Sequence, residues 1–367
     1  MKIIIICAQR EIGGAQTRAL DLADYCRTRG FDVYFYFLYR KREVFTERAE
    51  AYDLLESNLI KWSNLGVLVR ELANVLRDKK PAVVYAFQAP TFTLVSPIAA
   101  LMGVKRRVAI VTQPPGKLNV VLRLWDLLLG ITGLHTNVVV NSNYTRDQYS
   151  RYPSAYRDRI SKVYVGVNFP QQAPRLPKLG AVEDTRLSRL KLVCVGRLSI
   201  QKNHMLILRA MTNAPDNWEL TIIGEGELRD TLQQYAIDHD IAGKVSFAGE
   251  IERARLFQVL PEFDIFIFPS SWETFGIAAI DACACGLPVV ASDIPVLREV
   301  LDLESGRMAG LLFEPDNVAS LIASIKLVES DPMLSASLVQ NGLLLVERYT
   351  AERMGDDFLE VADVHAT

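Results

Sequence analysis

The chain has 367 residues, of which 50% are hydrophobic and 23% are charged, and its formal net charge is −2. This composition excludes a disordered chain, and the length exceeds one hydrophobic core, so we expect two domains of roughly 170 to 190 residues. The charge is uneven: Met1 to Pro170 holds 24 Lys and Arg against 14 Asp and Glu, a net +10, and the remainder is −12. We therefore expect the N-terminal half to meet an anionic partner.

The N-terminal half alternates short β-branched apolar runs with amphipathic segments of helical spacing, such as Ala15 to Arg29 and Val67 to Lys79. Its first run is six residues long with no cleavage pattern after it, so we interpret it as a buried strand rather than a signal peptide. The apolar stretch Leu118 to Leu134 is too short and too charged to span a bilayer. The predicted strands are Lys2–Cys7, Asp32–Leu38, Ala82–Ala86, Arg107–Thr112, Asn137–Asn141 and Ile160–Val165.

A linker is predicted over residues 169–190, where three prolines fall within eight residues and apolar periodicity is lost. A second series of strands follows, each with a helical segment after it, so we expect domains at 1–168 and 191–345. Both would be α/β, doubly wound and Rossmann-like, and would face a central cleft that is the default ligand site. The second series is Lys191–Val195, Glu219–Ile223, Val245–Ala248, Ile265–Phe268, Val289–Ala291 and Gly310–Phe313.

The five cysteines are odd in number and scattered, and three lie in apolar runs. We expect reduced thiols in a cytoplasmic protein. Cys283 and Cys285 have no second Cys pair or His cluster nearby, so we interpret them as small core residues rather than zinc ligands.

The second domain opens with a strand that runs into Gly196 and Arg197, and Lys202 follows five residues later. Arg can bind two oxygens of a diphosphate and Lys adds a point charge, so the pattern suits an anionic ligand. Two solvated surface cations would give the same local sequence, and the pattern alone leaves both interpretations open.

Two glycine pairs follow strands. Gly224 and Gly226 resemble a dinucleotide fingerprint but lack its third glycine, so we interpret them as a turn into a helix. Gly13 and Gly14 follow the first strand, where glycines let backbone N–H groups approach an anion; a tight structural turn is the alternative.

The segment 264–292 is the richest in chemistry. Gly276 lies early in a predicted helix whose first N–H groups, around Phe275 to Ile277, would face a phosphate. Glu273 precedes this helix and Asp281 comes eight residues later, about two turns on, so we expect the two carboxylates on roughly one side. Carboxylates accept hydrogen bonds from hydroxyl groups, which predicts a sugar or a ribose there.

The order of these motifs, with the stretches VVVNSNYTRDQY, YVGVN and GLLFEPDN, resembles the retaining glycosyltransferases of family 4, also called group 1, which have the GT-B fold. The resemblance covers essentially the whole chain. It implies a C-terminal helix at 346–367 that packs back on the N-terminal, acceptor-binding domain.

The resemblance also assigns roles. Arg197, Lys202 and Glu273 would be catalytic, the two cations on the donor diphosphate and the glutamate on the transferred sugar. Gln113 would lie on the acceptor or sugar side. The donor-binding set would be Gly13, Gly14, Gly196, Gly249, Glu250, Ile251, Thr274, Phe275, Gly276, Ile277 and Asp281. Within it, Asp281 would hold the ribose, Gly249 to Ile251 the base, and Gly13 and Gly14 would close over the phosphates.

Two positions depart from the family pattern. Asp281 is one methylene shorter than the usual glutamate, so its ribose contact would be weaker or shifted. Gln113 stands where a histidine is frequent, and an amide cannot act as an acid or base at neutral pH. We interpret His204 as a helix-start residue rather than a substitute.

No metal and no cofactor are expected. The only Asp-x-Asp pattern, Asp238-His239-Asp240, follows a helical segment rather than a strand, so the leaving charge would fall to Arg197, Lys202 and a helix N-terminus. The acceptor would be a glycan or a lipid-linked molecule in polysaccharide or glycoconjugate biosynthesis.

The basic N-terminal domain carries Lys105-Arg106-Arg107 and the segment KLNVVLRLWDLLLG. These predict peripheral contact with an anionic membrane on its inner face, although a buried helix with a solvated edge would look the same. We expect no nucleic-acid partner. Two other functions remain open: a nucleotide-sugar epimerase of the same fold, and a non-catalytic nucleotide-sugar-binding protein.

Overall fold

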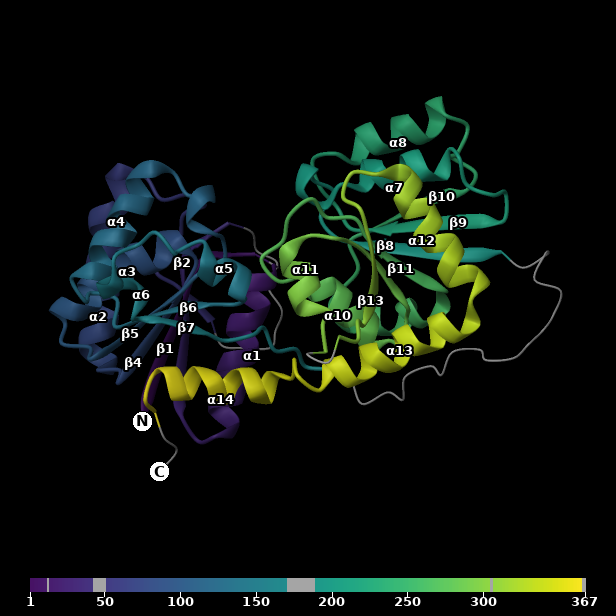
Figure 1. The fold of residues 1–367 in the computed structure, drawn as a ribbon. Helices are drawn as coiled ribbons and strands as arrows, with labels where there is room; N and C mark the ends of the chain where they lie inside the picture. Colours follow the sequence, from purple (N-terminus) through teal and green to yellow (C-terminus); the bar gives the residue numbers. More distant parts are fainter. Residues whose placement is uncertain (12, 42–50, 170–188, 304–305, 365–367) are drawn as a thin grey trace. The chain divides into compact units, whose positions relative to one another are not determined.

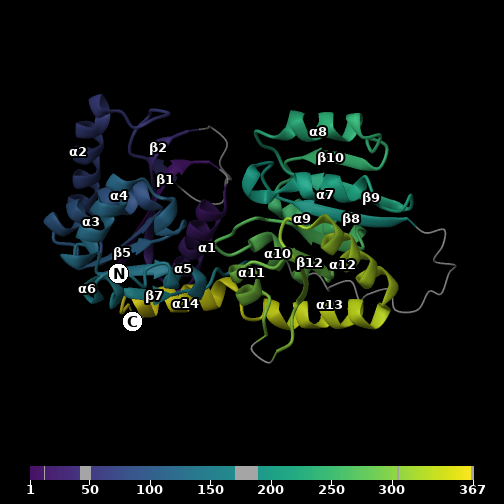
Figure 2. The same cartoon turned by 45° about the horizontal axis from the view of Figure 1, so that its top comes forward.

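The computed structural model describes residues 1–11, 13–41, 51–169, 189–303 and 306–364. The chain divides into two compact units. Unit 1 comprises Met1–Asn168 and Tyr349–Thr367, and unit 2 comprises Phe169–Arg348. Each is a parallel sheet with helices around it, seen from two directions in Figures 1 and 2. The predicted fold class, two doubly wound α/β domains, is confirmed.

Unit 1 contains a seven-stranded, wholly parallel sheet in which β1 lies between β2 and β4. The chain places β-branched and aromatic residues in these strands because they are buried on both faces. In spatial order the strands are β3 (Ala51–Asp53), β2 (Asp32–Arg40), β1 (Lys2–Arg10), β4 (Val83–Phe87), β5 (Arg106–Ile110), β6 (Asn137–Val140) and β7 (Ile160–Lys162).

The helices of unit 1 form two cores, one on each face of the sheet. Alternate residues of β1 point to opposite faces: Ile3 and Ile5 pack with α1 and α14, and Ile4 and Ile6 pack with α2 and α3. The helices are α1 (Gly14–Thr28), α2 (Trp62–Lys79), α3 (Ala89–Leu101), α4 (Val120–Ile131), α5 (Asn143–Asp147), α6 (Ser154–Arg157) and α14 (Ala351–Val361), with a 3₁₀ turn η1 (Pro115–Lys117).

Helix α14 comes from the end of the chain and completes unit 1. The Tyr85 hydroxyl donates to the carbonyl of Phe358 at 2.8 Å inside the core. Where the returning chain enters, the N–H of Val167 donates to Tyr349 at 2.8 Å and the N–H of Ala351 donates to Val167 at 3.2 Å. The C-terminal segment is thus held by side-chain burial and by backbone pairing.

Unit 2 contains a six-stranded parallel sheet. In spatial order its strands are β10 (Val245–Gly249), β9 (Trp218–Ile223), β8 (Leu190–Val195), β11 (Ile265–Phe268), β12 (Val289–Ser292) and β13 (Gly310–Phe313). Its helices are α7 (His204–Met211), α8 (Arg229–Asp238), α9 (Arg253–Val259), α10 (Ile277–Ala284), α11 (Pro295–Val300), α12 (Val318–Ser330) and α13 (Pro332–Val346), with 3₁₀ turns η2 (Ile200–Lys202) and η3 (Leu260–Glu262).

The strand order of each sheet reverses at one point. In unit 1 the reversal lies between β1 and β4, and in unit 2 it lies between β8 and β11. The connections on the two sides of a reversal lead to opposite faces, which opens a crevice beyond the carboxyl ends of those strands. Each reversal therefore marks where a ligand is expected to bind its unit.

The predicted strands agree with the structure to within a few residues at their ends, except that β3 was not predicted. Most of the predicted linker, residues 170–188, lies outside the described residues, and the described part of 169–190 includes the first residue of β8. Within the described ranges no helix combines the length and the apolar character needed to cross a bilayer.

Gly166 offers a test of how α14 is held. A Cβ at this position would lie 2.3 Å from the carbonyl oxygen of Thr350 and 2.5 Å from the Cβ of Met354. We expect Gly166→Ala to lower the free energy of unfolding by about 1 to 3 kcal/mol, because the start of α14 must shift. Urea denaturation followed by circular dichroism measures this change.

Gly66 provides the matched control. It lies inside α2, and a Cβ there meets nothing within 4 Å. Gly66→Ala should raise stability by about 0.5 to 1 kcal/mol, because alanine loses less backbone entropy in a helix. If both variants shifted stability equally, the close approach of α14 to Gly166 would not hold in solution.

Candidate functional site

Glycines allow the backbone to pack closely at the carboxyl ends of β8, β9 and β10. A Cβ on Gly224, which has φ +143°, would lie 2.0 Å from the carbonyl oxygen of Gly196. The N–H of Gly224 donates to Gly249 at 2.8 Å, and Gly249 has φ +75°. A Cβ on Gly226 would lie 2.4 Å from the carbonyl oxygen of Leu198. The turn predicted at Gly224 and Gly226 is thus a packing requirement, because only glycine permits these approaches.

Two cations follow this glycine junction. Arg197 is exposed and, among the described residues, has no hydrogen-bond or ion-pair partner. Lys202 ends η2, and its side chain runs across Gly196, whose Cβ would lie 3.3 Å from it. The Lys202 ammonium also lies 4.9 Å from the ring centre of Phe268, at the end of β11. The two cations thus lie beside the strand reversal of unit 2.

The carboxylate of Glu273 faces Lys202 across that reversal. Glu273 is buried, and its Oε1 pairs with the Lys202 ammonium and accepts a 2.9 Å hydrogen bond from Ser270. Its second oxygen, Oε2, has no partner among the described residues. One oxygen is therefore fixed by two donors, and the other remains available to a hydroxyl group.

Ser270 was not predicted as a site residue. It is fully buried directly after β11, and its hydroxyl orients Glu273. Two backbone contacts hold the same loop: the Gln201 side chain donates to Trp272 at 3.0 Å, and the N–H of Ser271 donates to Gln201 at 2.9 Å. The segments that carry Lys202 and Glu273 are therefore tied together.

Helix α10 begins later than expected, at Ile277 rather than near Phe275. Gly276 is its N-cap with φ +98°, and a Cβ there would lie 2.7 Å from Leu297. Among the described residues no side chain caps this helix, so its first N–H groups are open to an anion. Thr274 is half-buried and Phe275 is buried in the loop that leads to it.

Glu273 lies in the loop before α10 and Asp281 lies on the helix, as predicted, and their placement on one side of it stays a prediction. Asp281 is buried, and Arg253 at the start of α9 binds both its oxygens, at 2.7 and 3.3 Å. Burial raises the pKa of Asp281, and the Arg253 guanidinium opposes this rise. Arg253 was missed in the sequence because nothing in its spacing links it to Asp281, 28 residues away.

The predicted base-binding residues Gly249, Glu250 and Ile251 form the turn from β10 into α9. Glu250 is exposed and Ile251 half-buried, two residues before Arg253. Unit 2 thus brings together residues that follow three strands: this turn after β10, the two cations after β8, and Glu273 with the start of α10 after β11.

The remaining predicted residues belong to unit 1. Gly13 is extended, with φ −172°, a conformation open to any residue, and α1 starts at Gly14. A Cβ on Gly13 would meet only the end of the flexible Gln16 side chain. The interpretation of Gly13 as conformationally required is therefore wrong, although the glycines do lie at a helix N-terminus.

Gln113 lines a pocket of about 310 Å³ at the strand reversal of unit 1. The wall is rich in amide and hydroxyl groups, among them Gln9, Gln88 and Tyr39. Gln88 has φ +74°, unusual for a residue with a Cβ, and its side chain accepts a 3.3 Å hydrogen bond from the N–H of Ala8. The pocket suits a polar ligand with several hydroxyl groups.

The five cysteines are free and buried, and burial raises the pKa of Cys194, Cys283 and Cys285 to about 12. They are core residues rather than nucleophiles. Asp238 and Asp240 lie exposed at the end of α8, on no strand end. Neither group adds to the site.

His204, the first residue of α7, is buried beside Lys202. Burial lowers its pKa from 6.5 to about 4, so the fold favours the neutral ring. This contribution to stability is present above about pH 6.5 and is lost as the pH falls towards about 4. From about pH 7 to about pH 5 we expect wild type to lose about 2 kcal/mol more than His204→Gln.

Urea denaturation at both pH values measures that difference. His239→Gln is the matched control, because His239 is exposed and should leave the pH dependence unchanged. If the free energy of unfolding changed equally with pH in wild type and in His204→Gln, this would contradict a buried, neutral His204.

Two family models match the chain: Glycosyltransferase Family 4 over residues 12–169, and Glycosyl transferases group 1 over residues 181–344. An uncharacterized glycosyltransferase of Methanocaldococcus jannaschii is 26% identical over 236 residues, 61% of this chain and 59% of that protein. A GDP-mannose-dependent α-(1-6)-phosphatidylinositol dimannoside mannosyltransferase of Mycobacterium tuberculosis is 32% identical over 198 residues, 52% of this chain and 49% of that protein. The matched part of the chain thus spans about half to three-fifths of the length of these relatives.

The fold is similar to that of Anabaena HepE in complex with UDP and glucose, with a TM-score of 0.80, 17% identity and 98% of each chain covered. It is also similar to sucrose-phosphate synthase of Thermosynechococcus elongatus, with a TM-score of 0.76, 17% identity, and 98% of this chain and 97% of that one covered. The two family models follow one another in the order of the two units and together match most of the sequence. The chain therefore belongs to the group 1, family 4 glycosyltransferases and has the GT-B fold.

Proposed function

We propose that the protein is a retaining, metal-independent glycosyltransferase that moves a sugar from a nucleotide-sugar donor to a glycan, lipid-linked or other acceptor. One observation carries the proposal: at the strand reversal of unit 2, Glu273 is held by Lys202 and Ser270 with Oε2 left open, beside the unpaired Arg197. Anion-binding and hydroxyl-binding groups are thus adjacent, as a sugar joined to a diphosphate requires.

Arg197 and Lys202 would bind the donor diphosphate. When the bond between the sugar and the diphosphate breaks, its electron pair leaves with the phosphate and negative charge develops there. An ammonium group has three donors, so Lys202 can bind a phosphate oxygen while it still holds Glu273. The N-terminus of α10 at Gly276, with Thr274, Phe275 and Ile277 around it, adds favourable potential. Acceptor attack on the leaving-group face would retain the configuration.

Asp281 and the turn at Gly249 to Ile251 would hold the nucleoside. Arg253 lies between them and binds both oxygens of Asp281. A carboxylate oxygen can accept a ribose hydroxyl in addition to a guanidinium N–H. We propose that Arg253 keeps the buried, shorter acid ionised and correctly oriented for the ribose.

The pocket at Gln113 would bind the acceptor, with polar side chains available to its hydroxyl groups. Relatives are named for different acceptors: a Mycobacterium tuberculosis glycogen synthase, 31% identical over 163 residues, and a Campylobacter jejuni transferase named for a diphospho-undecaprenol acceptor, 32% identical over 154. Both kinds support a role in polysaccharide or glycoconjugate biosynthesis. A lipid-linked acceptor would place the protein in the cytoplasm, on the inner face of a membrane.

The positions of the charges support independence from metal. The cations Arg197 and Lys202 occupy the strand ends, whereas Asp238 and Asp240 lie at the end of α8. An epimerase of the same fold or a non-catalytic binding protein would use the same donor site. Incubation with a panel of nucleotide sugars distinguishes the three: a transferase releases free nucleotide, an epimerase converts the donor but need not accumulate nucleotide, and a binding protein turns nothing over.

The central test uses Arg197, because its side chain has no partner within the part of the chain that the structure describes. We expect Arg197→Ala to change the free energy of unfolding by less than about 0.5 kcal/mol. It should lower turnover at least about 100-fold, because Arg197 no longer stabilises the negative charge that develops on the leaving phosphate. Nucleoside diphosphate release is measured over a panel of nucleotide sugars, with and without EDTA. Arg209→Ala, exposed on α7, is the control. The proposal would be overturned if Arg197→Ala kept full activity, or if the wild type lost its activity in EDTA.

Arg253 offers a second test. Arg253→Ala removes the partner of the buried Asp281 carboxylate, so we expect the free energy of unfolding to fall by about 2 to 3 kcal/mol. This is less than for a fully buried pair, because part of the Arg253 side chain is exposed. The double variant Arg253→Ala/Asp281→Asn should regain most of the lost stability. The KM for the donor should rise in the single and in the double variant. Arg255→Ala, exposed on the same helix, should be nearly neutral. Urea denaturation and initial rates measure these effects; equal stability of the Arg253 and Arg255 variants would contradict the pair.

A further inference from the structure

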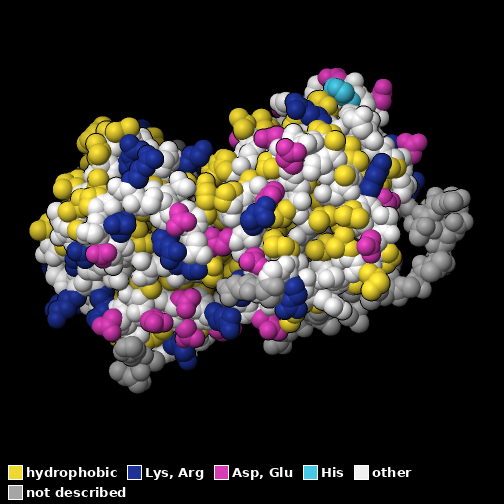
Figure 3. All heavy atoms as spheres, viewed as in Figure 1, with side chains coloured by type: hydrophobic (Ala, Val, Ile, Leu, Met, Phe, Trp, Pro, Cys, Tyr) yellow, Lys and Arg dark blue, Asp and Glu magenta, His cyan; other side chains and the backbone are white. Residues whose placement is uncertain are grey.

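Helix α4 in unit 1 exposes most of its apolar residues. Six large side chains, each between 39% and 79% exposed, recur at the spacing of one helix side. We call them the α4 surface: Val120, Val121, Leu124, Trp125, Leu128 and Ile131. In Figure 3 hydrophobic side chains gather over α4, with Lys and Arg side chains beside them. Six exposed large apolar side chains side by side on one helix point to an interaction with an apolar partner.

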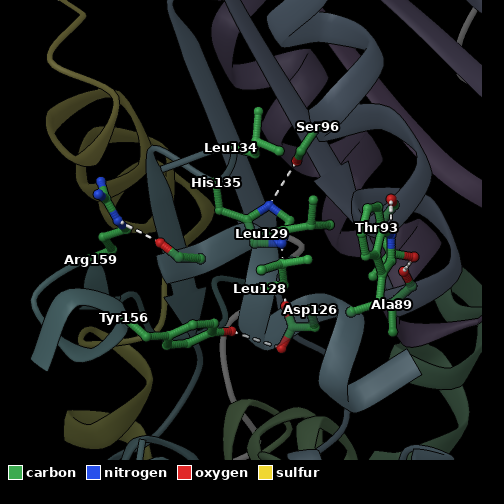
Figure 4. Close-up of polar contacts among 12 residues, drawn as sticks. Ala89, Thr93, Ser96, Asp126, Leu128, Leu129, Leu134, His135, Tyr156 and Arg159 are labelled. Atoms are coloured by element: carbon green, nitrogen blue, oxygen red, sulfur yellow. Dashed lines mark hydrogen bonds and ion pairs between the residues drawn. The ribbon is translucent and has the colours of Figure 1, made fainter. Parts of the chain in front are cut away.

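The buried side of α4 explains this orientation. Asp126, the only carboxylate on the helix, points inward and accepts a 2.9 Å hydrogen bond from Tyr156. His135 lies 3.3 Å from the other Asp126 oxygen and shares a 2.8 Å hydrogen bond with Ser96 (Figure 4). Rotating α4 to bury its leucines would expose this network and break its contacts. The helix is therefore fixed with the Asp126 carboxylate inside and the α4 surface outside.

Positive charge flanks both ends of the α4 surface. From residue 79 to residue 125 the sequence contains no Asp or Glu. Lys117 precedes the helix and Arg123 lies on it. The Arg107 guanidinium donates to the carbonyls of Gly133 and Leu134, which brings exposed Lys105 beside the far end of α4. An apolar face with cations at its borders matches an anionic lipid surface.

A second copy of the chain fits this surface poorly. One side of a helix of 12 residues covers roughly 18 Å by 10 Å, or about 180 Å², whereas a stable interface needs about 800 Å² per partner. Two such faces would also bring like charges together. An interfacial helix, by contrast, needs only an apolar face and flanking cations to enter a bilayer surface.

We propose that the α4 surface docks on an anionic bilayer, with α4 lying in the plane of the lipid headgroups. The proposal deepens the proposed function, on which it rests for a lipid-linked acceptor. Leu124, Trp125 and Leu128 enter the acyl boundary, and Lys105, Lys117 and Arg123 meet lipid phosphates. Binding then depends on anionic lipid and weakens as salt rises.

The test is co-sedimentation of the full chain with vesicles of phosphatidylcholine, alone or mixed with phosphatidylglycerol. We expect binding to the mixed vesicles only, reduced by added salt, and at least about 10-fold weaker for Leu124→Ser/Leu128→Ser. Lys105→Glu/Arg123→Glu should weaken it similarly. Ile237→Ser/Leu327→Ser removes two equally exposed apolar residues of unit 2 helices and should bind as wild type does.

Tryptophan fluorescence gives a second readout, since Trp125 should shift to the blue on the mixed vesicles and Trp125→Phe should remove the shift. Wild type that stays in the supernatant, or a Leu124→Ser/Leu128→Ser variant that sediments like wild type, overturns the proposal. So does a dimer in light scattering that the same variant abolishes. Donor cleavage without vesicles should persist in Leu124→Ser/Leu128→Ser, whereas Arg197→Ala should bind vesicles without turnover, which separates this proposal from the proposed function.

Discussion

The ion pair between Lys202 and Glu273 is the contact on which the rest of the donor site depends. It joins the segment after β8 to the segment after β11, across the point where the strand order reverses. Ser270 fixes the carboxylate from behind, and the packing of Gly196 against Gly224 leaves room for the lysine chain to pass. Because Glu273 is buried, its charge needs this partner; an uncompensated carboxylate in that position would be costly.

The sequence predicted the fold well because its signals are local. Runs such as Lys2 to Cys7 and Ile265 to Phe268 are short, β-branched or aromatic, and bounded by turn residues, so their strands were recognised almost to the residue. The exception was β3, three residues at the edge of its sheet, which has too few side chains for a periodic pattern. The start of α10 was predicted too early, because the left-handed backbone of Gly276 delays the helix to Ile277. The apolar pattern of the sequence does not reveal this conformation.

The site was predictable only in part. Arg197, Lys202 and Glu273 follow strands, and the carboxyl ends of parallel strands meet at one edge, so sequence position implied proximity. Arg253 and Ser270 act through pairings across the fold, which depend on side-chain direction and burial. The outward orientation of α4 was also undecided in the sequence, because its apolar residues surround the helix and the buried carboxylate of Asp126 determines which side faces solvent.

Helix α14 gives the chain an unusual order of assembly. Unit 1 owes part of its core to Met354 and Phe358, which are separated from the rest of that unit by the whole of unit 2. During synthesis the residues of unit 2 are therefore made before α14. Until α14 is made, unit 1 lacks this helix and the Tyr85 hydroxyl lacks its acceptor, the Phe358 carbonyl. Unit 1 can therefore complete its core only after all the residues of unit 2 have been synthesised.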